Sequence, residues 1–423
     1  MPHRQTAPDW RIVRGRARRA AAALLVGLVV SACGAAPPIS VSATPHTTAP
    51  TQTSEPSEPP RVTTAVDADF YEPPASLADA EPSDVIRSEE IFSPISDMRL
   101  WTVLYRSVGI DGEPIAVSGV IATPEETRDG PHQYLSWAHG TTGLADSTAP
   151  SRRGAASLLV DLLHGWTQDG FIVAATDYEG LGTPGLHPYF VGESEGRAVL
   201  DAARAARAFI GPDEDDSVVL AGHSQGGHAA LFAAELAPTY AADMPVLGTV
   251  AIAPAGDLAS LVSSSIGETA DEDHRYAALL VITAWRETLG LQTDQILTPA
   301  GAELAAALAE DDVVASPGDD PLFLADPITL PEWRDALEAN TPGAPPSPDS
   351  IAPILILQGT ADTIITVDSS QLVADRYCDV GVTAELRILE GDDHISVLVD
   401  HLVEIDDWIS QRLAGTPSEG CPL

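Results

Sequence analysis

The hydrophobic and polar positions of the chain predict a leading pair of antiparallel strands followed by alternating strands and helices. Residues 99–108 and 115–122 are rich in β-branched and aromatic side chains, and Gly109-Ile110-Asp111-Gly112 separates them as a turn. Beyond this hairpin, short apolar runs alternate with segments whose apolar residues recur at helical spacing. We expect strands at residues 132–138, 171–176, 217–221, 246–253, 354–357 and 384–389, and helices at residues 155–166, 193–210, 226–236, 369–377 and, to close the chain, 398–413. This alternation indicates an α/β fold with a mostly parallel central sheet and helices on both faces.

One long segment interrupts the alternation. After Pro254, about 100 residues rich in alanine and leucine separate the expected strand at residues 246–253 from the next one at residues 354–357. Their apolar residues recur at helical spacing, so we interpret the segment as a helical cap insertion at about residues 257–348. The folded domain, including this cap, is expected to cover residues 69–423.

The N-terminal segment has the pattern of an export signal. Six of the first 19 residues are arginine, and an apolar run of 11 residues from Ala20 to Val30 leads through small residues to Cys33. This pattern predicts a signal peptide at residues 1–32, and the run is too short to span a bilayer. Cys33 lies where a bacterial signal peptidase cuts before a lipid-modified cysteine; the alternative is an ordinary signal peptide with an incidental cysteine. Residues 33–68, rich in Ser, Thr and Pro, are then a flexible lipid-anchored tether.

Export determines the expected location and the expected state of the cysteines. We expect a protein that is either anchored on the extracellular face of the cell membrane or secreted, with membrane contact through the N-terminal lipid only. The compartment is oxidising, so Cys378 and Cys421 are free to pair, although two separate thiols are the alternative. The enclosed loop of 42 residues would contribute about 3–4 kcal/mol to stability.

Composition and charge remove several classes of function. All 22 basic residues are arginine, so lysine nucleophiles, Schiff bases and the lysine of a phosphate-binding P-loop are absent. The 62 acidic residues give a formal net charge of −40, which repels phosphate backbones, so we expect no nucleic-acid partner. The acid excess fits either adaptation to salt or a biased, lysine-free composition. Asp392, Asp393 and His394 resemble metal ligands, but no supporting histidine pair accompanies them, so a metallohydrolase is the weakest interpretation and no cofactor is expected.

The strongest chemical signal is Gly222-His223-Ser224-Gln225-Gly226, which stands between an apolar strand and a helical run. This is the G-x-S-x-G nucleophile elbow in its expected context. Its glycines leave room for a tight strand-to-helix turn that presents the hydroxyl of Ser224. The backbone N–H of Gln225, at the start of the helix, is then placed to stabilise an oxyanion.

A nucleophilic serine needs a base, and the base needs an acid to orient it. In this fold the chain order is serine, acid, histidine. Asp362 follows the strand at residues 354–357 and His394 follows the strand at residues 384–389, so both lie at carboxyl ends of strands. The alternative acids are Asp368, Asp392 and Asp393, of which the last two are better explained as part of a solvated loop. His401 is expected inside the last helix.

A second oxyanion donor is expected from the loop that follows an early strand. The strand at residues 132–138 ends in His139-Gly140-Thr141-Thr142-Gly143, where Thr141 offers its N–H and its hydroxyl. An ordinary glycine-rich turn is the alternative. His139 is interpreted as a packing residue of the loop rather than as a base.

Three segments together resemble the secretory lipase family of α/β-hydrolases, best known from fungal lipase A enzymes, here in a bacterial lipoprotein form. The segments are residues 139–146 (HGTTGLAD), 176–182 (TDYEGLG) and the elbow at residues 222–226, and the likeness covers about residues 69–423. The resemblance implies a triad of Ser224, Asp362 and His394, a helical cap over an acyl pocket, and hydrolysis of carboxylic esters. Where many relatives carry a cysteine, this chain has Ser147-Thr148, so one disulfide of the family is not expected.

The expected reaction is two-step acyl transfer on a small-molecule ester or lipid, such as an acyl-glycerol, by a monomer. Asp177 and Tyr178 follow a strand end and are interpreted either as residues lining the pocket or as a packed turn. A serine peptidase or an acyltransferase of the same fold is the alternative activity. A surface-anchored binding lipoprotein with a vestigial site is the non-enzymatic alternative.

Overall fold

The computed structural model describes residues 66–127, 130–154, 159–267, 270, 272–310 and 320–421. The expected signal peptide, Cys33 and nearly all of the expected tether lie outside these residues, as does part of the expected cap. Within the described ranges, no helix combines the length and the apolar character that a membrane crossing requires.

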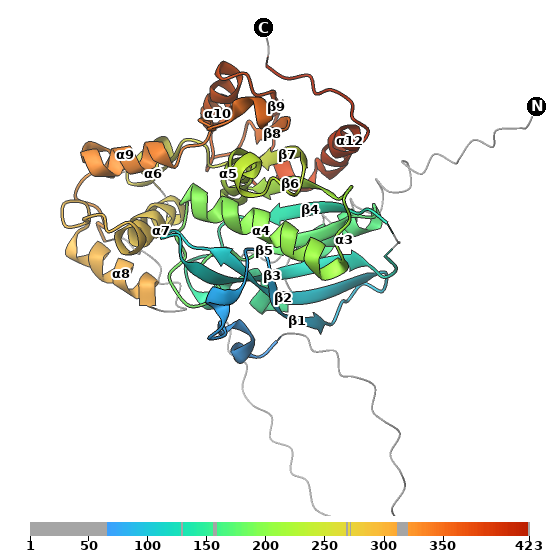
Figure 1. Ribbon diagram of the computed structural model, residues 1–423. Coiled ribbons are helices and arrows are strands. Elements are labelled where there is room, and N and C mark those ends of the chain that lie inside the picture. The colour runs from blue at the N-terminus through green and yellow to red at the C-terminus, as the bar shows by residue number, and fades with distance from the viewer. Residues whose placement is uncertain are drawn as a thin grey trace, which may run out of the picture. The chain divides into compact units, whose positions relative to one another are not determined.

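The core of the described part is a sheet of nine strands in the order β1-β2-β3-β5-β4-β6-β7-β8-β9 (Figure 1). The strands are β1 (Val85–Ile91), β2 (Met98–Val108), β3 (Pro114–Pro124), β4 (Gln133–Ala138), β5 (Ile172–Thr176), β6 (Ser217–His223), β7 (Val246–Ile252), β8 (Ile354–Gly359) and β9 (Ala384–Leu389). Strands β1, β2 and β3 pair antiparallel, and β3 pairs antiparallel with β5. All other pairs are parallel. The expected α/β class, with an antiparallel N-terminal hairpin and a mostly parallel sheet, is confirmed.

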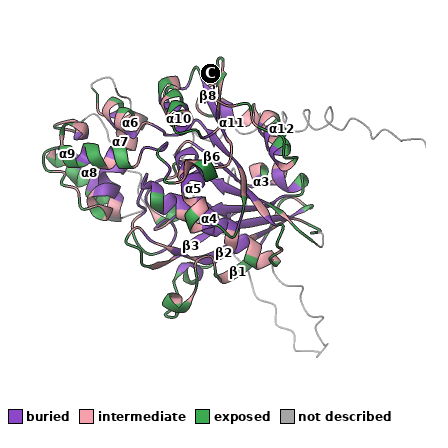
Figure 2. Ribbon diagram, turned by 45° about the horizontal axis from the view of Figure 1, so that its top comes forward, coloured by how far each residue is buried: buried purple, intermediate pink, exposed green. Residues whose placement is uncertain are grey.

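Helices cover both faces of this sheet because successive strand residues point to opposite sides. Helices α4 and α5 bury mostly alanines against one face, and α3 and α12 each bury a tryptophan and aliphatic residues against the other. Figure 2 shows the buried surfaces of these helices. The α-helices are α2 (Pro150–Arg153), α3 (Leu159–Gln168), α4 (Gly192–Ile210), α5 (Gln225–Tyr240), α6 (Leu258–Ser265), α7 (Glu272–Thr288), α8 (Pro299–Glu310), α9 (Pro331–Ala339), α10 (Val367–Asp379), α11 (Ser396–Val399) and α12 (Leu402–Leu413). Short 3-10 helices are η1 (Ala68–Tyr71), η2 (Leu77–Asp79), η3 (Asp146–Thr148), η5 (Pro327–Thr329) and η6 (Pro348–Ser350).

Helices α6 to α9 lie between β7 and β8, where the sequence pattern predicts an insertion, and we call them the helical insertion. They gather at one end of the sheet, on the left in Figure 1. Their apolar residues form a separate core in which the rings of Trp285 and Trp333 stack with centroids 5.9 Å apart. The same core includes Tyr189 and Phe190 from the segment before α4, so the insertion packs onto that segment.

The last helix differs from the expectation. A single helix through residues 398–413 is predicted, but the structure has two, α11 and α12, with His401 at the N-cap of the second. His401 therefore lies at a helix junction and not inside a helix. Its ring bonds Asp392 Oδ2 at 2.8 Å and Glu404 Oε2 at 3.1 Å. These two contacts use both ring nitrogens and explain why the junction is stable.

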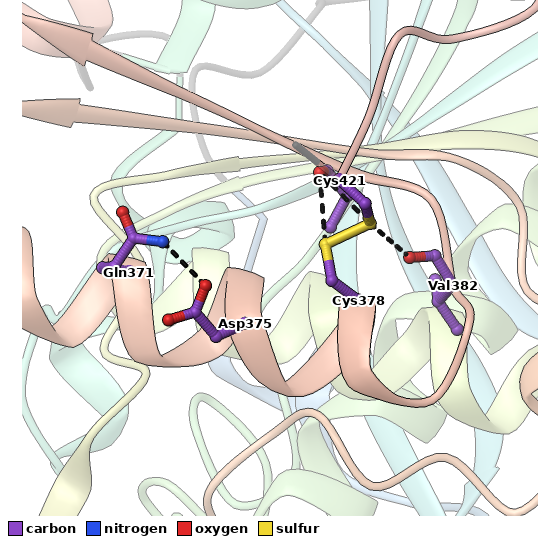
Figure 3. The surroundings of a disulfide bond; sticks show 6 residues. Gln371, Asp375, Cys378, Val382 and Cys421 are labelled. Carbon is purple, nitrogen blue, oxygen red and sulfur yellow. Dashed lines mark hydrogen bonds between the residues drawn. A yellow bond between two sulfur atoms is a disulfide. The ribbon is translucent and has the colours of Figure 1, made fainter. Parts of the chain in front are cut away.

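A disulfide joins Cys378, near the end of α10, to Cys421 in the C-terminal tail (Figure 3). The tail also pairs with the edge of the sheet, since the N–H of Cys421 donates to the carbonyl of Ala384 at 3.0 Å. The bridge thus closes a loop that contains β9, α11 and α12.

Candidate active site

Ser224 occupies the turn between β6 and α5 in a backbone conformation that is unfavourable for a side-chain-bearing residue. Its φ is 58° and its ψ is −117°, and such strain costs about 1–3 kcal/mol unless the surroundings hold it. Three backbone bonds hold it: Ser224 N–H donates to the carbonyl of Ile252 at 2.9 Å, and the carbonyl of Ser224 accepts from the N–H groups of His228 at 3.1 Å and Ala255 at 3.3 Å. The hydrogen bonds of its backbone therefore fix the position of Ser224 in the turn.

The elbow glycines are required because neighbouring backbone passes where a Cβ would be. A Cβ on Gly222 would overlap the carbonyl of Gly226, and a Cβ on Gly226 would overlap the carbonyl of Ala138 at the end of β4. A Cβ on Gly227 would come within 2.9 Å of Pro254 Cα. The glycines of the G-x-S-x-G motif are thus required by close backbone contacts on both sides of the nucleophile.

Asp362 and His394 meet at the carboxyl ends of β8 and β9. His394 Nδ1 and Asp362 Oδ2 are 2.7 Å apart, and Asp362 also accepts hydrogen bonds from the N–H groups of Ile364 and Ile365, both at 2.9 Å. Burial by itself raises the pKa of Asp362, but the hydrogen bond and positive potential of His394, together with those two N–H groups, hold it below its ordinary value of 3.8. The carboxylate is therefore ionised and placed to orient the imidazole.

His223 connects the nucleophile to this pair. Its Nε2–H donates to the backbone carbonyl of His394 at 2.7 Å, and the two rings have centroids 4.7 Å apart. Burial, with the nearby His394 ring, lowers the pKa of His223 to about 3, so its ring is neutral at physiological pH. This contact therefore joins His394 to the residue that precedes Ser224 in the chain. Within the described residues no hydrogen bond yet joins Ser224 to His394, and such contacts often tighten only when substrate binds.

The loop after β4 lies directly beside the nucleophile. A Cβ built on Gly140 would be 3.4 Å from His223 Nδ1 and 3.6 Å from the Cβ of Ser224. The next residue, Thr141, uses its hydroxyl in a 2.7 Å hydrogen bond with the hydroxyl of Tyr189. Either hydroxyl can be the donor in this bond, so the oxyanion role of Thr141, through its N–H or its hydroxyl, stays a prediction.

The side chain of Gln225 is buried, and its amide NH₂ forms two hydrogen bonds. Its Nε2 donates to Glu195 Oε1 at 2.8 Å and to His187 Nε2 at 2.8 Å. Gln225 is the first residue of α5, and the first N–H groups of a helix have no partner within the helix. Its backbone N–H is thus the group that this residue offers to the site.

The alternative acids lie elsewhere. Asp368 is exposed in the first turn of α10, and Asp393 accepts hydrogen bonds from the N–H groups of Ile395 and Ser396. The sequence predicts that Asp392 belongs to a solvated loop. The structure differs, because Asp392 forms a hydrogen bond with His401.

His139, in the loop after β4, and the two residues that follow β5 pack inside the domain. His139 is buried, with its Nδ1–H directed at the carbonyl of Gly140 at 2.6 Å. Asp177 accepts from Ser118 Oγ at 2.6 Å and from Ser151 N–H at 2.9 Å, and Tyr178 donates to the carbonyl of His139 at 2.8 Å. Of the two interpretations of Asp177 and Tyr178, the structure therefore supports the packed turn.

Two buried polar residues near the site have no motif that announces them. Gln358, in β8, donates to Asp362 Oδ2 at 3.1 Å and is itself held by Ser370 at 2.7 Å. Glu195, in α4, contacts Gln225. A polar residue inside an apolar strand or on the buried face of a helix was the available signal for both. In the part of the chain that the structure describes, no group of three or more His, Cys, Asp or Glu side chains is arranged to hold a metal ion.

A serine at a strained strand-to-helix turn, followed along the chain by an acid and then a histidine at strand ends, is the order found in α/β-hydrolases. The nine-stranded mixed sheet has the same architecture, and the fold is that of an α/β-hydrolase. Residues 156–279 match the model of the Secretory lipase family, so the chain is an α/β-hydrolase similar to the secretory lipases.

Individual relatives support this placement. The chain is 26% identical to the secreted triacylglycerol lipase LIP4 of Malassezia globosa, over 83% of this chain and 82% of that one. It is 27% identical to the probable inactive lipase MT1628 of Mycobacterium tuberculosis, over 83% of each chain. Among solved structures it is similar in fold to Candida antarctica lipase A in its closed state, with a TM-score of 0.70 and 18% identity over 85% of this chain and 89% of that one.

Proposed function

We propose that this protein is an exported serine hydrolase that cleaves carboxylic esters of lipids through an acyl-enzyme. The observation that carries the proposal is the 2.7 Å hydrogen bond between His394 and Asp362, and it is supported by the bond from the His394 backbone to His223, the residue before Ser224. An ionised acid, an oriented imidazole and a hydroxyl on a strained turn are the three groups that acyl transfer requires.

In the proposed reaction His394 Nε2 takes the proton of Ser224 as its Oγ attacks the ester carbonyl. Asp362 keeps the other ring nitrogen protonated and stabilises the imidazolium that forms. The backbone N–H groups of Gln225 and Thr141 stabilise the oxyanion of the tetrahedral intermediate. His394 then donates its proton to the departing alcohol, and water releases the acid from the acyl-enzyme by the same steps.

The proposed substrates are acyl-glycerols or similar lipid esters. A relative named as a triacylglycerol lipase supports this class. The apolar core of the helical insertion includes Ala255, whose N–H bonds the carbonyl of Ser224, so we propose that the insertion forms one wall of the acyl site. We further propose that Cys33 carries a lipid and that residues 33–68 tether the enzyme to the outer face of the membrane. Because another relative is named as probably inactive, activity itself is the first quantity to measure.

The decisive experiment compares Ser224→Ala with Ser410→Ala, a change at an exposed serine of α12, on p-nitrophenyl esters of increasing acyl length. Ser224→Ala should lower kcat at least about 10⁴-fold because nucleophile loss removes the covalent route. It should also abolish labelling by a fluorophosphonate probe, with an unchanged circular dichroism spectrum. Wild-type turnover in Ser224→Ala would overturn the proposal. Cleavage of a peptide panel, or acyl transfer to an alcohol in preference to water, would redirect it to the other activities of this fold.

A further inference from the structure

We infer that Glu195 is a positioning residue: through the side chain of Gln225 it fixes the backbone N–H that stabilises the oxyanion. The inference deepens the proposed function and rests on it. Glu195 lies on α4 and is fully buried against the first turn of α5, the helix that Gln225 begins. A buried carboxylate so close to a nucleophile, with no part in the proposed proton transfers, needs another explanation.

Both carboxyl oxygens of Glu195 have hydrogen-bond partners. Oε1 accepts from Gln225 Nε2 at 2.8 Å and from the N–H of Phe190 at 2.9 Å. Oε2 lies 2.9 Å from His228 Nδ1. Glu195 thus contacts two residues in the first turn of α5, and the backbone N–H of one of them, His228, donates to the carbonyl of Ser224 at 3.1 Å.

His228 and Glu195 form a buried hydrogen-bonded pair. His228 Nδ1 lies 2.9 Å from Oε2 of the carboxyl group, and its Nε2 lies 2.8 Å from the carbonyl of Asn340. A carbonyl can only accept, so Nε2 carries a proton, and the contact between Nδ1 and Oε2 holds a further proton. Burying polar groups costs free energy even when they are paired, so apolar packing alone does not account for this pair.

Gln225 has no freedom to turn. One amide hydrogen goes to Glu195 and the other to His187 Nε2. His187 accepts because its Nδ1–H donates to the carbonyl of Glu179 at 3.0 Å, and burial lowers its pKa to about 4, which keeps the ring neutral. With both amide hydrogens committed, the backbone of Gln225 is held, and so is the direction of its N–H.

The helical insertion forms the far end of this network. Asn340 is the C-cap of α9; its carbonyl accepts from His228, and its side-chain Oδ1 accepts from the N–H of Gly192 at 2.9 Å. Glu195 and His228 are thus clamped between α4, α5 and α9. The carboxyl group that holds Gln225 is therefore itself held by Phe190 and by His228.

The test is Glu195→Met, which keeps the length of the side chain but removes both oxygens. Glutamine is unsuitable, because its Oε1 could still accept from Gln225 while its NH₂ donates to His228 Nδ1. We expect kcat to fall about 10- to 100-fold, less than the 10²–10³-fold cost of removing an oxyanion donor outright, with KM nearly unchanged. An alkyl trifluoromethyl ketone, whose serine adduct carries an oxyanion in the same place, should lose affinity by the same factor. A purely structural role would not make kcat and ketone affinity fall together.

Glu235→Met is the matched control. Glu235 is a buried carboxylate on α5, the helix that Gln225 begins, and it accepts from Tyr377 Oη and from the N–H of Gly343, both at 2.7 Å, without contacting Gln225. The same substitution there should lower the melting temperature but leave kcat and ketone affinity at their wild-type values. An equal loss of kcat in Glu235→Met would overturn the inference.

Gln225→Met supplies a second variant if Glu195→Met fails to fold. It keeps the backbone N–H and the shape of the side chain but removes both amide bonds, and it should reproduce the fall in kcat. The double variant should be little worse than either single one, because both break the same contact. Wild-type kcat in the single variants, or strictly additive losses, would overturn the inference. If Ser224→Ala stays active, the proposed function has failed instead, independently of Glu195.

Discussion

The two halves of the candidate site are built in different ways. The elbow occupies six consecutive residues, 222–227, and its shape comes from backbone packed against backbone. The acid–histidine pair comes from two loops, with Asp362 and His394 separated by 32 residues and joined by side-chain hydrogen bonds. The first kind of geometry depends on the absence of side chains, and the second on the presence of specific ones.

This difference determines how each half should fail. Backbone overlap at the elbow has no inexpensive relief, because strand, turn and helix would all have to move. A lost hydrogen bond at the acid–histidine pair leaves the fold in place and changes only orientation and charge. The elbow should therefore lose structure and activity together, whereas the pair should lose activity with structure intact.

The largest effect is expected for Gly226→Ala. The added Cβ would overlap the carbonyl of Ala138, so the elbow and β4 must separate. We expect a loss of at least about 4 kcal/mol in the free energy of unfolding, together with loss of ester hydrolysis. Gly267→Ala, where the nearest atom to a new Cβ is 3.5 Å away, is the control and should be close to wild type in urea unfolding. A stable, active Gly226→Ala protein would show that the elbow is not held by backbone contact.

Asp362→Asn should give the next largest effect. Asparagine can still accept from the N–H groups of Ile364 and Ile365, so the loop is preserved, but it no longer stabilises the imidazolium and favours the wrong tautomer. We expect kcat to fall about 10⁴-fold with little change in melting temperature. The exposed Asp368 provides the control, and Asp368→Asn should leave kcat unchanged. The reverse result would move the acid to Asp368.

Removing the disulfide should affect stability more than catalysis. The Cys378→Ser/Cys421→Ser double variant releases the loop that carries His394, and we expect it to lose about 2–4 kcal/mol in urea unfolding. Below the melting transition kcat should stay near the wild-type value, since the bonds of Asp362 and His394 remain. Wild-type protein unfolded in the presence of a reductant should show the same midpoint as the variant. An unchanged midpoint in both would mean that the loop is held without the bridge.

The smallest effect is a pH dependence from His401. Burial lowers the pKa of its ring, but the hydrogen bonds and charges of Asp392 and Glu404 raise it above 6.5 overall. Protonated His401 therefore adds stability that is fully present below pH 6.5 and is lost as the pH rises through the raised pKa. The melting temperature of His401→Gln should fall below that of the wild type by a few degrees at most at low pH, and the difference should vanish at high pH. His132→Gln is the control; a difference that stays constant with pH would contradict the assignment.

The sequence pattern predicts the sheet well because the parallel strands are apolar runs bounded by turn residues. Apart from small shifts at their ends, β4 to β9 lie where they are expected, and the elbow is recognised because its glycines, strand and helix are adjacent in the chain. Asp362 and His394 are found by their position after strands. Strand β1, in contrast, has mostly half-exposed or exposed residues and no apolar run to mark it.

Long-range side-chain contacts are the part that the sequence pattern misses. Glu195 is expected on a helix, but nothing local shows that its carboxylate meets Gln225 and His228, which lie at least 30 residues away. The break between α11 and α12 is missed for the same reason, because the bonds of His401 to Asp392 and Glu404 favour the junction while the apolar spacing favours one helix. Polar networks are specified by the folded structure, and periodicity carries little information about them.

The bridge between Cys378 and Cys421 has a consequence for how the molecule withstands damage. A protease that cuts once anywhere from residue 379 to residue 420 leaves two pieces joined covalently, so the piece that carries the histidine cannot diffuse away. A nicked molecule would therefore elute like the intact one in gel filtration and would separate into fragments only in denaturing electrophoresis under reducing conditions.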